Sequence, residues 1–126
     1  MRLLLDTNIF LWITAERSDK LTAKARNVLD SASAIFVSSA SIWEIAIKVR
    51  LGKLDADPEA MIGAIEASGF KELPVLARHA VGVASMPLHH GDPFDRLLVA
   101  QAISETMRLL TADSHLAAYS ELVVTI

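Results

Sequence analysis

The sequence contains no cysteine among its 126 residues, which excludes disulfide bonds, thiolate zinc sites and a cysteine nucleophile. It also lacks any apolar run of membrane-spanning length. The first apolar stretch is interrupted by Asp6 after three leucines, so the start does not resemble a signal peptide. These absences favour a cytoplasmic protein that makes no use of a membrane.

An excess of positive charge is missing as well. The chain has 12 Lys and Arg against 15 Asp and Glu, which gives a net charge of -3 at pH 7. A protein that holds nucleic acid by charge alone is strongly basic. Chemistry on nucleic acid would therefore need metal ions and a local basic rim. Lys48, Arg50, Lys53 and Arg96 could supply that rim, although each is equally well interpreted as an ordinary surface charge.

Two groups of catalytic motifs are also absent. No Gly-x-Ser-x-Gly occurs, which argues against a serine hydrolase, and no glycine-rich loop that cradles phosphates is present. At this length, with 52% hydrophobic residues, the chain is predicted to form one domain over residues 1–126 with a substantial core.

Short apolar segments alternate with helical patterns along the chain. Strands are predicted at 2–5, 35–37, 72–75, 109–110 and 122–125, and helices near 9–13, 22–30, 41–51, 58–69, 77–85, 93–107 and 114–119. This alternation predicts a three-layer α/β/α sandwich around a mainly parallel sheet. The first strand is expected at the centre. Pro74 cannot donate a ladder hydrogen bond, so 72–75 is expected at one edge and 122–125 at the other.

Four acids stand at or just beyond the predicted strand ends and helix starts: Asp6, Glu44, Asp95 and Asp113. Parallel strands share one edge at their carboxyl ends, so these acids are expected to converge. Structural alternatives exist for three of them. Asp6 and Asp113 could cap the helices that follow, and Glu44 could complete a capping box begun by Ser41 or pair with Lys48 at i, i+4.

The segment Asp92-Pro93-Phe94-Asp95 separates two aspartates by role. Asp92 precedes a proline at the first helical position and is predicted to cap the helix. Asp95 lies on the same helical face as Leu98 and Val99, so it is predicted to point inward. A carboxylate directed into a core is costly unless a cation meets it.

Clustered carboxylates raise one another's pKa unless a cation intervenes. Oxygen ligands without histidine or cysteine favour Mg²⁺, with Mn²⁺ as an alternative, and these ions bind phosphates. Such an ion can activate water for attack on a phosphodiester. The acids therefore predict a metal-dependent phosphodiester hydrolase, and no histidine is assigned to the metal.

Six segments in a fixed order carry a resemblance to a known family. They are 4–7 (LLDT), 11–12 (LW), 37–48 (VSSASIWEIAIK), 52–54 (GKL), 92–102 (DPFDRLLVAQA) and 111–113 (TAD). Together they resemble the PIN-domain ribonucleases, and more narrowly the VapC toxins of bacterial toxin-antitoxin pairs. The resemblance implies magnesium-dependent RNA cleavage, homodimerisation and inhibition by a cognate VapB-like antitoxin.

The same resemblance implies the roles of individual residues. Asp6, Glu44 and Asp95 would be the principal catalytic and metal-binding acids, with Asp113 as the fourth. The residues expected to support them are Thr7, Asn8, Ser39, Asp92, Arg96 and Thr111. The antitoxin is expected to silence the site with a positive side chain, most simply arginine, whose fork matches carboxylates.

Two other functions compete with this prediction. A phosphatase could use Asp6 as a nucleophile, but phosphatases of the haloacid dehalogenase type have a second aspartate two residues later, where this chain has Asn8. A catalytically silent PIN-like module could act only through its partner, although the intact acid set argues against it. The homodimer is expected to use the apolar run 9–13 with Trp12, unless these residues fill the core.

Overall fold

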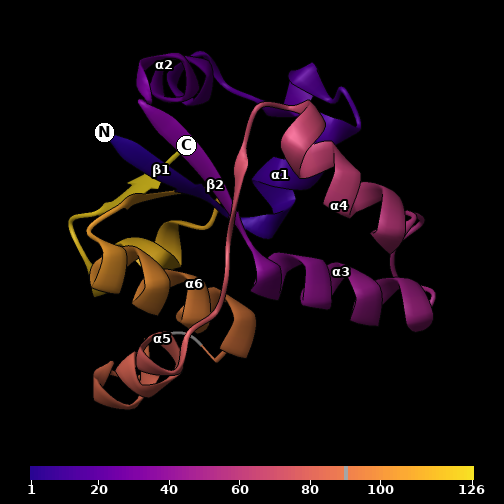
Figure 1. The fold of residues 1–126 in the computed structure, drawn as a ribbon. Helices are drawn as coiled ribbons and strands as arrows, with labels where there is room; N and C mark the ends of the chain where they lie inside the picture. The colour runs from indigo at the N-terminus through magenta and orange to yellow at the C-terminus, as the bar shows by residue number, and fades with distance from the viewer. Residues whose placement is uncertain (90) are drawn as a thin grey trace.

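The computed structural model describes residues 1–89 and 91–126, and there five parallel strands form one sheet in the order β3-β2-β1-β4-β5 (Figure 1). The strands are β1 (Arg2–Leu5), β2 (Ala34–Ser38), β3 (Lys71–Leu73), β4 (Arg108–Thr111) and β5 (Val123–Thr125). The α/β fold class, the central first strand and both predicted edge strands are confirmed. The edge strand β3 stops just before Pro74, which lacks the N–H that a ladder needs.

Helices cover both faces of the sheet. They are α1 (Thr7–Thr14), α2 (Ala23–Ser31), α3 (Ser39–Arg50), α4 (Pro58–Ala67), α5 (Ala77–Gly82) and α6 (Pro93–Glu105), with 3₁₀ turns η1 (Ser18–Lys20), η2 (Val83–Ser85) and η3 (Ser114–Tyr119). Helices α1, α3 and α4 lie on one side of the sheet, and α5 and α6 lie on the other (Figure 1). None of the helices in the described part of the chain has the length and apolar character to cross a bilayer.

The central strand β1 shows why the chain forms two apolar layers. Its side chains alternate between faces, so Leu3 and Leu5 pack with Ile45 of α3, whereas Leu4 packs with Leu98 of α6. All three strand leucines are fully buried, as expected for a parallel sheet covered on both sides. Replacing any of them by alanine would cost about 2–5 kcal/mol, which makes β1 the anchor for the residues that follow it.

The apolar run after β1 mostly fills the core. Ile9 and Phe10 are fully buried in the same cluster as Leu3, and Trp12 is half-buried against it. The expectation that this run supplies a dimer surface is therefore wrong for Ile9 and Phe10. Large exposed apolar side chains occur elsewhere, among them Trp43 on α3.

Helix ends follow the predicted capping chemistry with one exception. The Thr22 hydroxyl accepts the backbone N–H of Ala25 at the start of α2. At the end of α3, Gly52 adopts the left-handed conformation that the sequence predicts for a helix stop. The exception is the capping box of Ser41 and Glu44, because α3 begins at Ser39 and its N-cap is Ser38.

Several other boundaries differ from the prediction. The helix predicted at 77–85 divides into α5 and η2, and the 3₁₀ turn η1 lies at residues 18–20, where the sequence predicts neither helix nor strand. Helix α6 stops at Glu105, because Thr106 takes a left-handed backbone conformation with φ of 54°. Its N–H then turns back to the carbonyl of Ile103, which closes the helix two residues earlier than predicted.

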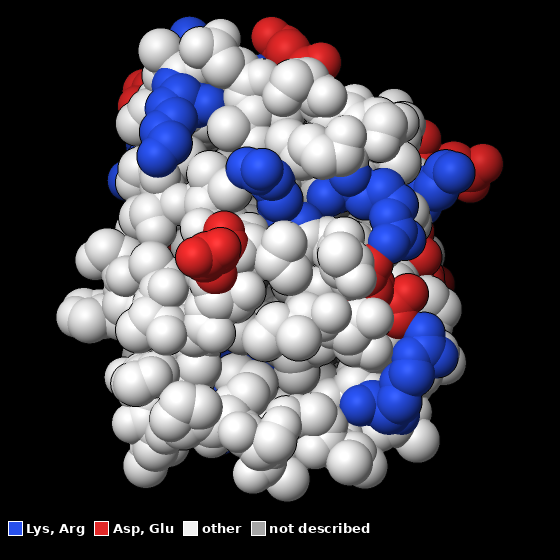
Figure 2. Space-filling view, turned by 90° about the vertical axis from the view of Figure 1, so that its left-hand side faces the viewer, with Lys and Arg blue, Asp and Glu red and all other residues white. Residues whose placement is uncertain are grey.

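Charge is unevenly distributed over the surface. Three strands begin with an exposed basic residue, namely Arg2, Lys71 and Arg108. Figure 2 views the molecule from the side on which the N-terminus lies in Figure 1, and Lys and Arg side chains cross the upper half of this face. The lower left of this face is largely without charged side chains, whereas basic side chains stand at its lower right, so charge is gathered in separate parts of this face.

Candidate metal centre

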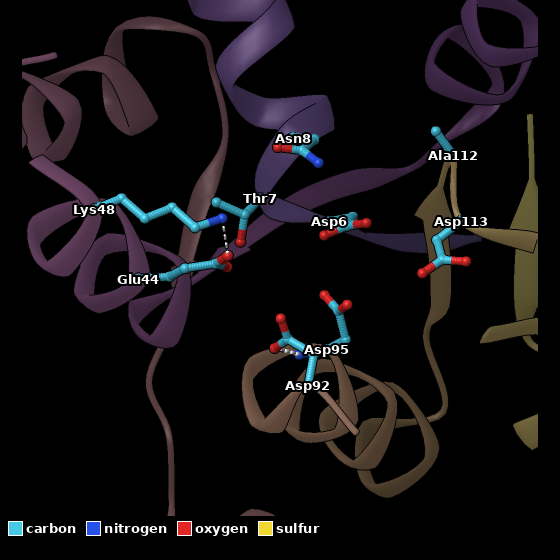
Figure 3. Close-up of a pocket in the computed structure, with 9 residues that line it drawn as sticks. All are labelled: Asp6, Thr7, Asn8, Glu44, Lys48, Asp92, Asp95, Ala112 and Asp113. Atoms are coloured by element: carbon cyan, nitrogen blue, oxygen red, sulfur yellow. Dashed lines mark hydrogen bonds and ion pairs between the residues drawn. The ribbon is translucent and has the colours of Figure 1, made fainter. Parts of the chain in front are cut away.

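A pocket of about 250 Å³ opens where β1 and β4 end, beside helices α3 and α6 (Figure 3). It brings together all four acids that the sequence singles out. Its lining consists of Asp6, Thr7, Asn8, Glu44, Lys48, Asp92, Asp95, Ala112 and Asp113. The predicted convergence at the carboxyl edge of the sheet is therefore what the fold produces.

Asp6 lies at the floor of this pocket, directly after the buried strand β1. Its residue is 6% exposed, and the Thr111 hydroxyl donates to Oδ2 at 2.6 Å from the end of the neighbouring strand β4. Burial raises the pKa of Asp6, the Thr111 and Thr7 hydrogen bonds oppose that rise, and the nearby charges of Glu44 and Asp113 add to it. The carboxylate is held in place at a cost that a nearby cation would relieve. Although Asp6 stands at the N-cap of α1, its side chain makes no capping hydrogen bond.

Glu44 projects from α3 with its two carboxylate oxygens in different situations. Oε2 accepts an ion-pair contact from Lys48 Nζ at 2.8 Å, which confirms the predicted i, i+4 pair. Oε1 is buried and has no hydrogen-bond partner among the described residues. A buried oxygen without a partner costs about 1–3 kcal/mol, more when charged, so Glu44 is incomplete as a purely structural group.

The two aspartates at the start of α6 divide as the sequence predicts. Asp92 is the N-cap, and its Oδ1 accepts the backbone N–H of Phe94 at 2.8 Å and of Asp95 at 3.2 Å. The Asp95 carboxylate points across the pocket toward Asp6 (Figure 3). The cap thus fixes the first turn of α6, and that turn directs Asp95 at the site.

Asp113 both caps the turn η3 and lines the pocket. Its Oδ1 accepts the backbone N–H of His115 at 2.9 Å and caps η3, and the His115 ring nitrogen Nδ1 lies 3.0 Å from the same oxygen. The side chain also lines the pocket, opposite α3 (Figure 3). Capping and site position are therefore compatible in this residue.

The residues predicted to support the acids fall into two groups. Thr111 fixes Asp6, while the Thr7 hydroxyl donates to Ser41 Oγ at 2.8 Å and ties α1 to α3. Asn8 is exposed at the rim of the pocket. These three, like Asp92, lie where the sequence analysis expects them.

Ser39 and Arg96 are not in the pocket lining. The Ser39 hydroxyl accepts the backbone N–H of Val75 and so fixes the chain after β3. The Arg96 guanidinium donates to the Pro87 carbonyl and to the Tyr119 hydroxyl, both at 3.1 Å. The polar atoms of Ser39 and Arg96 thus bind other segments of the chain, and their support of the acids stays a prediction.

The histidines are likewise kept apart from the acids, except His115. His79 is fully buried between α5 and α6, and the His89 ring packs edge-on against Tyr119 with centroids 5.0 Å apart. His90 lies outside the described residues. Lys48 also lines the pocket, whereas the sequence suggested it only as part of a basic rim, an ordinary surface charge or the partner of Glu44 in a helix-stabilising pair.

The pocket residues fit a hard divalent cation. The donors are carboxylate oxygens, and both the buried Glu44 Oε1 and the buried Asp6 carboxylate would gain from a positive charge. Within residues 1–89 and 91–126, no three acidic or histidine side chains already stand close enough together to enclose an ion. Binding would therefore draw the carboxylates inward from the walls of the pocket.

The family model of the PIN domain matches residues 3–122. The chain belongs to the PIN-domain family. The match spans all the elements that line the acid pocket, from β1 to η3. No curated protein sequence matches the chain.

Solved structures share this PIN fold over nearly their whole length. VapBC2 from Rickettsia felis, bound to a promoter DNA fragment, is 16% identical with a TM-score of 0.69, covering 100% of this chain and 98% of that one. A toxin-antitoxin complex from Klebsiella pneumoniae is 17% identical with a TM-score of 0.67, covering 98% and 96%. FitAB bound to an IR36 DNA fragment is 20% identical with a TM-score of 0.63, covering 98% and 94%.

Proposed function

We propose that this PIN domain is a magnesium-dependent endoribonuclease that acts as the toxin of a toxin-antitoxin pair. Membership of the PIN family supports a nuclease in general. The observation that carries the proposal concerns the acid pocket, in which Glu44 Oε1 is buried near the buried Asp6 and has no hydrogen-bond partner in the part of the chain that the structure describes. Such a pocket is costly in the free protein and becomes favourable when a cation enters it.

Asp6, Glu44, Asp95 and Asp113 would hold the ion, with Mn²⁺ as a possible substitute for Mg²⁺. When bound, the ion supplies activation of water and stabilisation of charge on the phosphoryl oxygens. The protein supplies the positions of the ligands. Thr111 anchors Asp6, and the Asp92 cap directs Asp95, so two ligands are fixed before substrate arrives.

The structure weakens the phosphatase alternative. A nucleophilic Asp6 would have to approach phosphorus directly, but its residue is 6% exposed and its Oδ2 is bound by Thr111. Asn8, in the place of the second aspartate that such phosphatases use, is exposed at the rim and cannot act as a carboxylic acid. A metal ligand at Asp6 needs neither direct access to phosphorus nor a carboxylic acid at position 8.

The proposed partners are RNA as substrate, a VapB-like antitoxin and a second copy of the chain. The similar solved structures include the VapBC2, Klebsiella and FitAB complexes, which supports an antitoxin partner. We expect this antitoxin to place a cationic side chain at the acid pocket, because an arginine fork matches carboxylates. A homodimer is supported by exposed apolar side chains rather than by the buried run after β1. The most exposed of these are Leu88 and Val81, followed by Trp43 and Leu51.

The test compares RNA ends after brief induction of the parent and of Asp6→Asn in cells. New 5′ ends at discrete positions should accumulate with the parent and be absent with the variant. A matched control is Asp30→Asn, because Asp30 is exposed on α2 and outside the pocket. Purified parent should cleave a structured RNA in proportion to added Mg²⁺. Lack of cleavage at any metal concentration would leave the silent binding module as the better account.

A further inference from the structure

Lys48 enters the acid pocket from the last turns of α3. Its Nζ lies 2.8 Å from Glu44 Oε2, and its side chain is 43% exposed, whereas that of Glu44 is 7% exposed. The ammonium therefore lies at the boundary between the buried acid and the open mouth of the pocket (Figure 3). It is the cationic member of a lining that otherwise includes five carboxylates.

A helix-stabilising pair does not explain this arrangement. Ordinary i, i+4 pairs lie on the solvated surface of a helix, where both groups keep water and gain about 0.3–0.5 kcal/mol. Here the carboxylate is buried, and only one of its two oxygens is paired. A residue selected only to support α3 would not require Glu44 to be buried with Oε1 left unsatisfied.

The geometry assigns separate partners to the two oxygens of Glu44. Lys48 holds Oε2 and so fixes the orientation of the carboxylate, in which Oε1 is buried without a hydrogen-bond partner among the described residues. An ammonium group has three N–H donors, and the contact with Glu44 uses one of them. The others are available at the pocket mouth, where a phosphate of a bound strand would arrive.

We propose that Lys48 contacts the phosphate of the RNA substrate and positions Glu44 for the metal ion, so that one side chain links the two. The inference rests on the proposed function. It implies two opposing effects of the Lys48 charge, because a cation at this position repels a divalent ion and attracts a phosphate. A purely structural residue would change both properties in the same direction or neither.

The experiment uses Lys48→Met, which keeps much of the stem and removes the charge, and Lys48→Arg, which keeps the charge. The control is Lys71→Met, an identical replacement of an exposed lysine at the start of β3, outside the pocket. Each full-length protein is melted in a Mg²⁺ titration without RNA, and kcat and KM are measured on a structured RNA at saturating Mg²⁺.

Lys48→Met should need roughly three- to tenfold less Mg²⁺ for half-maximal thermal stabilisation, because one repelling charge is gone. Its kcat/KM for RNA should fall by roughly 10- to 100-fold even when the metal is saturating. Lys48→Arg should recover most of that loss, and Lys71→Met should match the parent in both assays.

Three outcomes would overturn the inference. Weaker Mg²⁺ binding together with weaker cleavage in Lys48→Met would mean that Lys48 only orients Glu44. Parent-like values in both assays would remove Lys48 from the site. A parent protein that shows neither Mg²⁺ stabilisation nor cleavage would overturn the proposed function itself, and that result does not depend on any Lys48 variant.

Discussion

Carboxylates lie in different surroundings at the two ends of the parallel sheet. At the carboxyl end, Asp6 and Glu44 are buried, and Glu44 keeps one oxygen without a partner among the described residues. Near the amino end lies Glu105, the last residue of the helix α6 whose first turn carries Asp95, and the protein supplies its counterions. Glu105 contacts the guanidinium of Arg78 and lies 2.8 Å from Nε2 of His79.

The hydrogen bonds around His79 determine which ring nitrogen carries the proton when the ring is neutral. Its Nδ1 accepts the backbone N–H of Leu76 at 2.9 Å, so the ring proton is on Nε2 and is donated to Glu105. The hydrogen bonds from His79 and Arg78 lower the pKa of Glu105, whereas burial raises the pKa of Asp6. At the amino end, the carboxylate of Glu105 is therefore satisfied by Arg78 and His79 of α5, and this contact joins α5 to α6. At the carboxyl end, the carboxylates of Asp6 and Glu44 would gain from a bound cation.

The largest expected effect separates function from stability at the carboxyl end. Asp95→Asn should lower RNA cleavage by roughly 10²–10³-fold, because a ligand directed at Asp6 loses its charge. The metal-free variant should be as stable as the parent or more so, because one of several crowded like charges is gone. Thermal melting with and without Mg²⁺ would show the parent gaining more stability than the variant.

Asp92→Ala is the counterpart of Asp95→Asn within the same helical turn. It should lose about 0.5–2 kcal/mol of stability, because two N–H groups lose their cap, and should retain much of the cleavage activity. Full activity in Asp95→Asn with loss of activity in Asp92→Ala would reverse the two roles.

Substitutions near the amino end of the sheet should lower stability without changing the cleavage activity. His79→Ala removes a fully buried side chain and leaves the N–H of Leu76 without its acceptor, so we expect a loss of about 2–4 kcal/mol in urea unfolding. At a temperature where the variant is folded, its Mg²⁺-dependent cleavage should match the parent. A selective loss of activity would show that the two ends are coupled.

The dependence of stability on pH should have opposite signs at the two ends. The folded, metal-free protein binds the Asp6 proton more tightly than the unfolded chain, so the free energy of unfolding should fall as pH rises above 3.8, the ordinary pKa of aspartate, through the raised folded-state value. Glu105 has a lowered pKa, so its contribution should be lost as pH falls below 4.5, the ordinary pKa of glutamate. We expect the free energy of unfolding, measured across this pH range, to lose the decrease with rising pH in Asp6→Asn and the decrease with falling pH in Glu105→Gln.

The smallest expected effect is a change in stability on replacing Arg78, the exposed member of the cluster that Arg78, His79 and Glu105 form near the amino end of the sheet. Arg78 is 58% exposed in its side chain, so Arg78→Ala should cost only about 0.2–1 kcal/mol despite its ion pair with Glu105. Measuring it beside His79→Ala shows how much of the cluster's contribution comes from the buried ring. A loss as large as that of His79→Ala would mean that the charge, not the burial, stabilises this end.

The sheet and most of the site could be predicted because their signals are local. Strand β1 is short, apolar and ended by an acid, and the proline after Asp92 distinguishes the cap from Asp95 three residues later. The start of α3 could not be predicted, since Ser38, Ser39 and Ser41 are all able to cap a helix. The strand β2 ends at Ser38, which pairs with Leu73 of the distant strand β3.

The direction of Arg96 depends on contacts that no local pattern encodes. Its sequence position beside Asp95 suggested a basic rim, but Pro87 and Tyr119 offer acceptors on the outer side of α6. The two partners lie 9 and 23 residues away in the chain. The proposed role of Lys48 could not be predicted for a different reason. An ordinary i, i+4 pair on a helix surface explains Lys48 and Glu44 from the sequence, and only the structure shows that Glu44 is buried.

The hydrogen bond between Asp6 and Thr111 joins residues 105 positions apart, and it has a consequence for synthesis. Strand β1 is synthesised before its neighbour β4, which follows about 100 residues later, at roughly 5–20 residues per second. For roughly 5–20 s the nascent chain therefore carries Asp6 without the strand that fixes it or Asp113 beside it. The acid pocket can form only after β4 and Asp113 have been synthesised, so a chain that stalls before β4 is made cannot assemble it.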